Sequence, residues 1–356
     1  MSAFRPFLGI ARVETLRLLR SPSSLTLLLL VPVLQLLLFG AAIRPDAVVL
    51  PVAIAGPDPA GHVAAALRRE PGLRIVETSP STGRAEEAVH AGRAALGIDL
   101  PRGRTPVLAT IDGTEPALTS GADARVRAVY GQLLADRFGV ADLGPGLVVD
   151  RLYNPQGRAA WGFLPALVGV VMMIAMTVLG TLSLSREREI GTWEALIALP
   201  PGPALLLAGK IAPYVVIGTL QGVAVLVLAI LLFDLPATGS IAALIALMPL
   251  FAAAHLVLGH VLAARAANQL SALQGAIAFY LPAMLLSGFL YPFATLPGWA
   301  RAIGEVFPLT HFIRAARAAT LRSGSAGDVL AHGLPIAAFL AAAFLLARAV
   351  HRPVLD

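Results

Sequence analysis

The chain has 356 residues, of which 57% are hydrophobic and only 13% are charged. Because a typical soluble domain carries about 25% charged residues, this composition indicates a membrane protein. Cysteine is absent, which excludes a disulfide framework, a thiol nucleophile and a cysteine-based metal site.

The N-terminal segment, 1–24, is predicted to form an amphipathic helix before the first apolar run. At about 100° per residue its apolar side chains share one sector and its arginines the opposite one: Phe4, Phe7, Leu8, Ala11, Leu18 and Leu19 against Arg5, Arg12, Arg17 and Arg20. Such a helix should lie in the headgroup plane of the inner leaflet. Two interpretations remain open: an anchor that sets topology, or an elbow that moves with a cytoplasmic partner.

Six apolar runs are long enough to cross a bilayer, which takes roughly 20 helical residues. They are predicted at 25–43, 161–184, 211–233, 241–264, 271–290 and 333–350. The first run has a second interpretation as a cleaved signal peptide, which the long patterned segment before it disfavours. The predicted fold class is therefore a polytopic α-helical membrane protein with six transmembrane helices.

The segment 44–160 between the first two runs is predicted to be a folded α/β or α+β domain on the extracytoplasmic side. Short β-rich runs such as "VVLPVAIAG", "LRIVET" and "GLVVDRL" alternate with helical runs such as "GHVAAALRRE". Its 13 arginines balance 13 acidic residues, so the net charge of +6 belongs to the membrane part. That placement favours anionic lipid as a partner and disfavours nucleic acid.

Orientation follows from the basic residues near the spans. With both termini inside, the cytoplasmic pieces 1–24, 185–210 and 351–356 and the 265–270 link hold more Arg and Lys than the short outer segment 291–332, and the long domain 44–160 counts little toward the rule. The segment 291–332 would then lie outside. We therefore predict cytoplasmic N- and C-termini.

The stretch 185–200, "SREREIGTWEALIALP", places four consecutive charges after an apolar run. On a helix, Trp193, Leu196, Ile197 and Pro200 share one face, with Arg186 to Glu189 as a polar start. A charged helix with an apolar stripe in the cytosol fits a partner's groove. A solvated loop that merely stops translocation is the equal alternative.

This stretch resembles the cytoplasmic loop of ABC-2-type transport permeases, in the subfamily with a large extracytoplasmic domain after the first span. The resemblance implies a coupling helix that docks on a separate ATP-binding subunit. The positions it assigns to that coupling are Arg186, Glu187, Arg188, Glu189, Gly191, Thr192, Trp193, Glu194 and Leu196. Charge reversal at Glu187 and Glu189 is then expected to release the ATPase.

Two other regions resemble the same family. "DGTEPALTSG" and "VVDRLYNPQGR" match at Asp112, Gly113, Asn154 and Pro155. The region after the fifth span, "LSGFLYPFATLPGWARAIGEVFPLTHFIRAARAATLRSG", matches at Gly288, Pro292, Pro308, Leu309 and Arg314. The resemblance implies short extracytoplasmic helices there.

No catalytic, metal or cofactor site is predicted in the chain itself. The nearest approach to a phosphate loop, Gly202 to Lys210, has the wrong spacing and no preceding strand. His255 and His260 point about 140° apart on one helix, so each is expected to bond a neighbouring helix rather than a shared metal. ATP and Mg would enter only through the partner subunit.

The sequence thus predicts a non-enzymatic permease subunit of an ATP-driven exporter in a bacterial inner membrane. Its implied partners are an ABC ATP-binding subunit, a second permease copy or paralogue, and membrane lipids. The alternative is a membrane-anchored sensor or assembly factor with an external ligand-binding domain. Drugs, lipids, polysaccharide precursors and ions all remain open as substrates.

Overall fold

The computed structural model describes residues 4–21, 26, 28, 32–33, 36, 49–58, 61–70, 72–100, 106–114, 119, 121–138, 146–191, 203–264 and 266–350. Most of the first predicted span, 25–43, lies outside these residues, as do Thr192, Trp193, Glu194 and Leu196 of the predicted coupling helix. The chain divides into two compact units. The membrane unit holds Met1–Ala41, Leu164–Leu290 and Ala302–Asp356, and the sheet unit holds Ala42–Phe163 and Tyr291–Arg301.

The sheet unit contains a mixed five-stranded sheet in the order β2-β1-β3-β4-β5. Its strands are β1 (Leu50–Ala55), β2 (Leu73–Ser79), β3 (Leu96–Asp99), β4 (Val107–Asp112) and β5 (Leu147–Leu152). Only the β3–β4 pair is antiparallel among these described strands. The segments predicted from alternation as strands therefore lie in one sheet.

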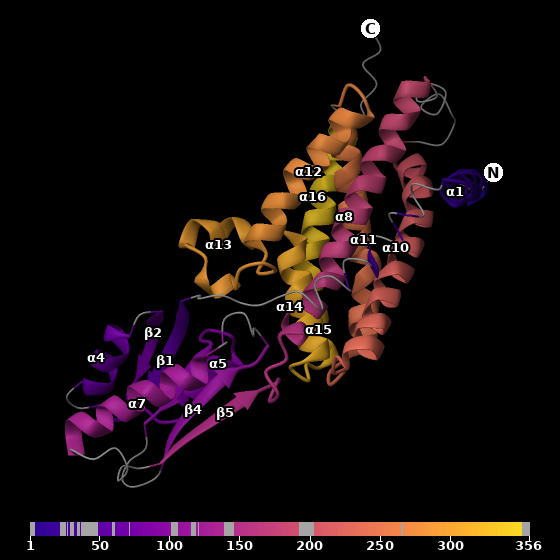
Figure 1. Ribbon diagram of the computed structural model, residues 1–356. Coiled ribbons are helices and arrows are strands. Elements are labelled where there is room, and N and C mark those ends of the chain that lie inside the picture. Colours follow the sequence, from indigo (N-terminus) through magenta and orange to yellow (C-terminus); the bar gives the residue numbers. More distant parts are fainter. Residues whose placement is uncertain are drawn as a thin grey trace. The chain divides into compact units, whose positions relative to one another are not determined.

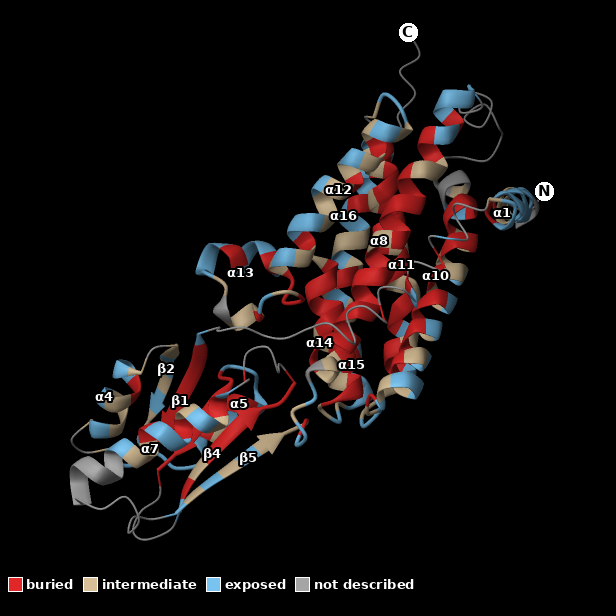
Figure 2. Ribbon diagram, viewed as in Figure 1, coloured by how far each residue is buried: buried red, intermediate tan, exposed pale blue. Residues whose placement is uncertain are grey.

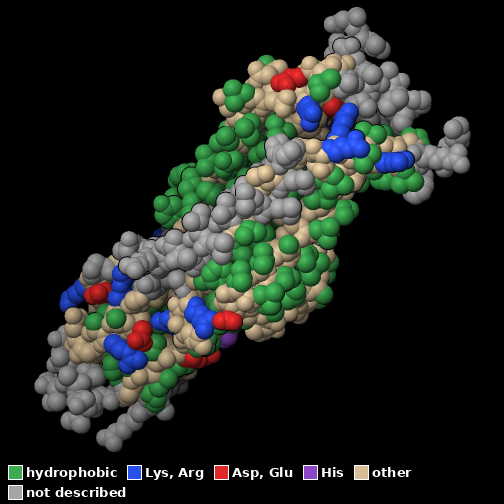
Figure 3. Space-filling model, turned by 45° about the vertical axis from the view of Figure 1, so that its right-hand side comes forward, with side chains coloured by type: hydrophobic (Ala, Val, Ile, Leu, Met, Phe, Trp, Pro, Cys, Tyr) green, Lys and Arg blue, Asp and Glu red, His purple; other side chains and the backbone are tan. Residues whose placement is uncertain are grey.

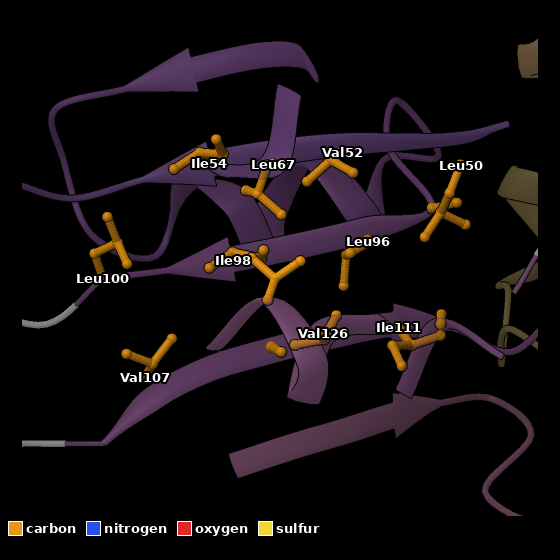
Figure 4. Close-up of a cluster of buried hydrophobic side chains, with 14 residues drawn as sticks. Leu50, Val52, Ile54, Leu67, Leu96, Ile98, Leu100, Val107, Ile111 and Val126 are labelled. Atoms are coloured by element: carbon orange, nitrogen blue, oxygen red, sulfur yellow. The ribbon is translucent and has the colours of Figure 1, made fainter. Parts of the chain in front are cut away.

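Helices cover both faces of this sheet. On one face α4 (His62–Arg69) and α7 (Ala122–Phe138) contribute Leu67 and Val126 to a core with Val52, Leu96 and Ile111 (Figure 4). On the other face α5 (Arg84–His90) packs its alanines and Val89 against β1. Gly97 permits this approach, because a Cβ there would lie 2.6 Å from the Ala85 carbonyl oxygen.

The membrane unit is a bundle of long helices with α1 (Phe4–Leu19) beside it (Figure 1). The long helices are α8 (Ala159–Ile190), α10 (Pro203–Phe233), α11 (Ile241–Ala264), α12 (Gln269–Leu286) and α16 (Gly333–Val350). Among the described residues, five helices are long and apolar enough to cross a membrane. The unit also holds α14 (Pro308–Thr320) and α15 (Ala326–Ala331), while η2 (Phe293–Thr295) and α13 (Gly298–Gly304) lie in the chain before them.

The helix α8 forms the centre of the bundle and is buried along most of its length (Figure 2). Glycines let its neighbours approach: a Cβ on Gly259 of α11 would lie 2.5 Å from the Thr177 carbonyl oxygen. On α10, Gly218 and Gly222 lie against the thioethers of Met176 and Met172. These two glycines, four positions apart, therefore pack against α8 within this chain.

Two predicted boundaries differ from the structure. The second span was expected to end at 184, but α8 continues to Ile190. The third was expected to begin at 211, but α10 begins at Pro203. Arg and Glu have high helix propensity, so a helix can continue through charged residues after its apolar run has ended.

Candidate functional site

The last turn of α8 contacts four other helices. Glu187, Arg188 and Glu189 are consecutive, so their side chains leave the helix about 100° apart and reach in three directions. We call these three residues the α8 triplet. Each member bonds a different part of the membrane unit.

Glu187 joins a buried ion cluster with α1 and α10. Its Oε1 lies 2.6 Å from the Nζ of Lys210, and the same Nζ lies 2.7 Å from Oε1 of Glu14. Arg17 donates from Nη1 to Glu187 at 2.8 Å, and the Tyr214 hydroxyl donates to Glu14 at 3.2 Å. Two carboxylates and two cations thus meet where three helices converge.

Burial makes this pairing obligatory. The side chains of Lys210, Glu187 and Glu14 are 2%, 4% and 5% exposed, whereas Arg17 is 46% exposed. An unpaired charge at such depth is strongly unfavourable, so the three buried ions depend on one another. With Arg17 the cluster has no net formal charge, and Arg17 is its link to solvent.

One face of α1 and a glycine on α10 allow these two helices to pack closely. Phe7, Ile10, Glu14 and Leu18 lie on one face of α1 by three- and four-residue spacing, and Glu14 and Leu18 are its buried residues among those described. A Cβ on Gly209 would lie 3.2 Å from the Ile10 Cβ, so glycine allows the close packing.

The face of α1 that packs against α10 is not the whole apolar sector read from the sequence. Two members of that sector, Leu8 and Leu19, are 48% and 55% exposed. The packed face instead includes an acid, Glu14, because Lys210 on α10 offers it a buried cation. A prediction from hydrophobic periodicity alone assigns a carboxylate to the solvent-exposed side of a helix. It therefore does not identify the face of α1 that packs against α10.

Arg188 and Glu189 bond the two helix ends on either side of the 265–268 link. Arg188 Nη1 donates to the last carbonyls of α11, at Ala263 (3.4 Å) and Ala264. Glu189 accepts from the backbone N–H of Gln269 at 2.6 Å and from its side-chain amide, at the start of α12. A cation at a helix C-terminus and an anion at an N-terminus both favour the helix dipole.

The α8 helix ends immediately after the triplet. Gly191 has φ +75°, a left-handed conformation that glycine adopts without strain, and its N–H donates to the Arg188 carbonyl. Arg186 is exposed, and Ile190 is 63% exposed. Of the charged quartet, Glu187 is buried and Arg186, Arg188 and Glu189 are exposed; Arg188 and Glu189 nevertheless bond the neighbouring helices α11 and α12.

Sequence reasoning missed Glu14, Arg17, Lys210 and Tyr214 as parts of this site. One signal was present: Lys210 is the only lysine in the chain and opens an apolar run. Its partner Glu14 lies 196 positions away, so only the fold brings them together. Figure 3 shows basic side chains gathered beside α1, at one end of the membrane unit.

The predicted residues after the fifth span hold turns and helix starts. Gly288 has φ +87° just beyond α12, Pro292 precedes η2, and Pro308 is the first residue of α14. Leu309 is fully buried. Arg314 donates two hydrogen bonds to Glu305, at 2.8 and 2.7 Å, and this pairing lowers the pKa of Glu305.

The matched residues of the sheet unit join the ends of β4 and β5. The Gly113 N–H donates to the Leu152 carbonyl at 3.0 Å. Asn154 is completely buried and exchanges two 3.0 Å hydrogen bonds with the backbone of Arg158. Pro155 follows in the same turn, so these residues stabilise a loop between adjacent strand ends.

The Nδ1 atoms of the intramembrane histidines bond their own helix. Those of His255 and His260 pair with the carbonyls of Phe251 and Leu256, four residues earlier on α11. The expected bonds to a neighbouring helix stay a prediction. Within the described part of the chain, no group of three or more His, Asp or Glu is placed to hold a metal.

Comparison with known proteins identifies the family. The model of the ABC-2 type transporter family matches residues 132–321, more than half of the chain. Over 354 residues, 95% of this chain and 92% of the relative, the sequence is 26% identical to the probable multidrug ABC transporter permease YbhS of Escherichia coli K12.

Two further relatives come from the same bacterium. The probable multidrug ABC transporter permease YbhR is 30% identical over 166 residues, and the inner membrane transport permease YhhJ is 29% identical over 199. These matches cover 47% and 55% of this chain. They span about half of those relatives, 45% and 52%.

Proposed function

The chain belongs to the ABC-2 type transporter family, and from this premise we propose that it is the permease subunit of an ATP-driven exporter. A separate ATP-binding subunit would supply the energy, and two permeases, identical or paralogous, would pair. The observation that carries this proposal is the α8 triplet, which belongs to the predicted coupling positions Arg186 to Leu196 and bonds α1, α10, α11 and α12.

The triplet supports a mechanical role. A force on the segment after Gly191 reaches α8 through one backbone connection. Because Glu187, Arg188 and Glu189 each bond another helix, a shift of the α8 end would move those helices with it. Buried ion pairs resist separation, so they transmit displacement rather than yield.

The ion cluster also supports an ATP site on another subunit. Lys210, the lysine of the nearest phosphate-loop-like sequence, lies within α10 and is engaged by Glu14 and Glu187. A phosphate-binding lysine must instead be free to reach a nucleotide from a loop that follows a strand.

The same contacts support the proposed orientation. The end of α8, the start of α10, the helix ends beside the 265–268 link and α1 lie at one end of the membrane unit, because side-chain hydrogen bonds join them. That end carries Arg12, Arg17, Arg20, Arg186 and Lys210. Because basic ends face the cytoplasm by the positive-inside rule, we propose that this end is cytoplasmic and that the segment 44–160 is extracytoplasmic.

The substrate class follows only from relatives. YbhS and YbhR are named probable multidrug permeases, and we propose efflux of an unidentified compound for this chain. Drugs, lipids, polysaccharide precursors and ions are the classes to test.

The proposal is tested by reconstituting the chain with the ATP-binding cassette protein encoded by a neighbouring gene. We expect Trp193→Ala combined with Leu196→Ala to abolish co-purification and any permease-dependent ATPase activity. Trp299→Ala is the matched control, because Trp299 is a 67% exposed tryptophan on α13. If the double variant keeps the ATPase bound and stimulated, the docking segment is wrong. If the purified chain hydrolyses ATP alone, the subunit assignment is wrong.

A further inference from the structure

His255 has a buried ring nitrogen without a hydrogen-bond partner, in the interior of the span α11. Its Nδ1 lies 3.0 Å from the Phe251 carbonyl oxygen. A carbonyl oxygen only accepts hydrogen bonds, so Nδ1 carries the proton and Nε2 presents a lone pair. His255 is 1% exposed, and Nε2 has no partner within the described residues. An unpaired buried acceptor costs about 1–3 kcal/mol, so it calls for a partner from outside the chain.

Aromatic rings from several helices pack around this imidazole. Phe251 lies on His255 with ring centroids 4.4 Å apart, and Phe279 of α12 meets the imidazole edge to face at 6.4 Å. Both phenylalanines contact further rings from α14 and α16, elements that pack with α11 in the same bundle (Figure 1). We call the whole set the aromatic cluster: Phe251, His255, Phe279, Phe307, Phe312 and Phe339.

The helix α12 is the wall of this cluster that separates most easily. Phe251 and Phe312 are fully buried, whereas Phe279 on α12 is half-buried. Alanine makes few dispersion contacts, so a helix packed through alanines leaves its neighbours at little cost. The start of α12 is also bonded to the α8 triplet, through Gln269 and Glu189. The buried residues of α12, among those described, are Ala272, Ala276 and Ala283.

The chemistry of the cluster selects its ligand. Nε2 accepts a hydrogen bond, so the ligand must donate one, and phenylalanine rings favour an aromatic body. An anion would face both the Nε2 lone pair and the negative faces of the rings. A cation would be buried without a carboxylate in the cluster to balance its charge. The ligand that fits is therefore uncharged.

We propose that His255 and the aromatic cluster bind uncharged aromatic compounds that carry an O–H or N–H donor. This site rests on the proposed function, for which it names the substrate class. The compound displaces Phe279 together with α12, donates its hydrogen bond to Nε2 and packs against the remaining rings. Because the donor satisfies a buried acceptor, it raises the affinity about tenfold over the same compound without a donor. A force on the α8 triplet reaches the site through the Glu189–Gln269 bonds.

Naphthol and its methyl ether test the hydrogen bond, because the ether keeps the rings and the oxygen but lacks the donor. Binding of each tritium-labelled compound is measured on the full-length chain in nanodiscs, without the ATPase, and corrected with empty nanodiscs. We expect naphthol to bind about tenfold more tightly than the ether. His255→Phe should remove this preference. His260→Phe is the matched control and should keep it, because His260 is also buried on α11 and bonded through Nδ1 but points about 140° away.

A second variant tests the rings. Phe279→Leu should weaken the binding of both compounds about threefold and leave the preference for naphthol unchanged, since it removes a ring but not Nε2. Phe233→Leu, at the end of α10, is the control outside the cluster. A wild type that binds naphthol and the ether equally, or a preference that survives in His255→Phe, would overturn the proposal.

The site and the export function fail separately. If naphthol does not bind while other compounds stimulate the ATPase of the reconstituted complex, the site is wrong and the proposed function stands. If naphthol binds with the expected preference but no ATP-binding subunit responds to this chain, the site is supported and the export function is wrong.

Discussion

Replacing Lys210 by methionine tests the buried ion cluster most directly. Methionine keeps much of the apolar stem but removes the buried cation that both carboxylates share, leaving the half-exposed Arg17 as their remaining cation. Oε1 of Glu14 and Oε1 of Glu187 lie within 2.7 Å of the same nitrogen, so without it they face each other at about 5 Å. At an effective dielectric constant of about 20, two like charges at that separation repel by about 3 kcal/mol.

The expected outcome is a loss of about 3–5 kcal/mol in the free energy of unfolding, the range seen when one partner of a buried pair is removed. The assay is thermal unfolding of the purified protein, followed by a double-mutant cycle with Glu14→Gln. Glu14→Gln should destabilise the wild type but partly rescue Lys210→Met, because it removes the repulsion.

The rescue separates the ion cluster from ordinary packing. If Lys210→Met were merely a cavity or shape defect, Glu14→Gln would add its own destabilisation. Arg301→Met, at an exposed position, serves as the control for the substitution itself and should change little. A Lys210→Met protein as stable as the wild type, or one made worse by Glu14→Gln, would refute the reasoning.

Three further predictions concern other contacts. Arg314 lowers the pKa of Glu305, so their ion pair contributes its full stability above pH about 4.5 and loses it as the pH falls through the lowered pKa. At this half-exposed site the wild type should be more stable than Arg314→Gln by about 1 kcal/mol or less, and this difference should vanish on acidification. A difference that grew on acidification would contradict the pairing. Gly209→Val should push α1 from α10 and expose Glu14, measured as faster labelling of Glu14→Cys than in the Gly209 parent; equal labelling would mean the close approach is unimportant. Asn154→Ala should destabilise the protein by about 1–3 kcal/mol, since the two hydrogen bonds of the buried amide to the Arg158 backbone are lost, and unchanged thermal unfolding would contradict that role.

Local sequence patterns predicted the secondary structure well where the hydrophobic periodicity agrees with the residues that end helices and strands. The strand β2 alternates between half-buried and exposed residues along its whole length, as its alternating sequence indicates. The helix α11 has the bounds Ile241–Ala264 expected from the apolar run. In both cases residues a few positions apart carry the signal, so no tertiary contact is needed to read it.

The ion cluster could not be read in this way. Glu14, Glu187 and Lys210 come from three distant segments, and each taken alone looks like a surface charge at the end of an apolar run. In the structure these side chains are buried instead. A charge inside the bundle requires partners, and only the fold identifies them. The pattern showed that charges occur at the end of α8 but not that they bond inward.

This inward bonding changes how docking must be tested. Charge reversal at Glu187 would place a second cation beside Lys210 and Arg17, and reversal at Glu189 would remove the bonds to Gln269. Loss of ATPase binding in such variants would then report a damaged bundle as readily as a lost interface. Arg186 is exposed and is not a member of the triplet, so Arg186→Glu tests the interface without removing any of the triplet's bonds. We expect it to weaken ATPase binding while leaving thermal unfolding unchanged; a variant that binds normally would confine docking to the residues beyond Gly191.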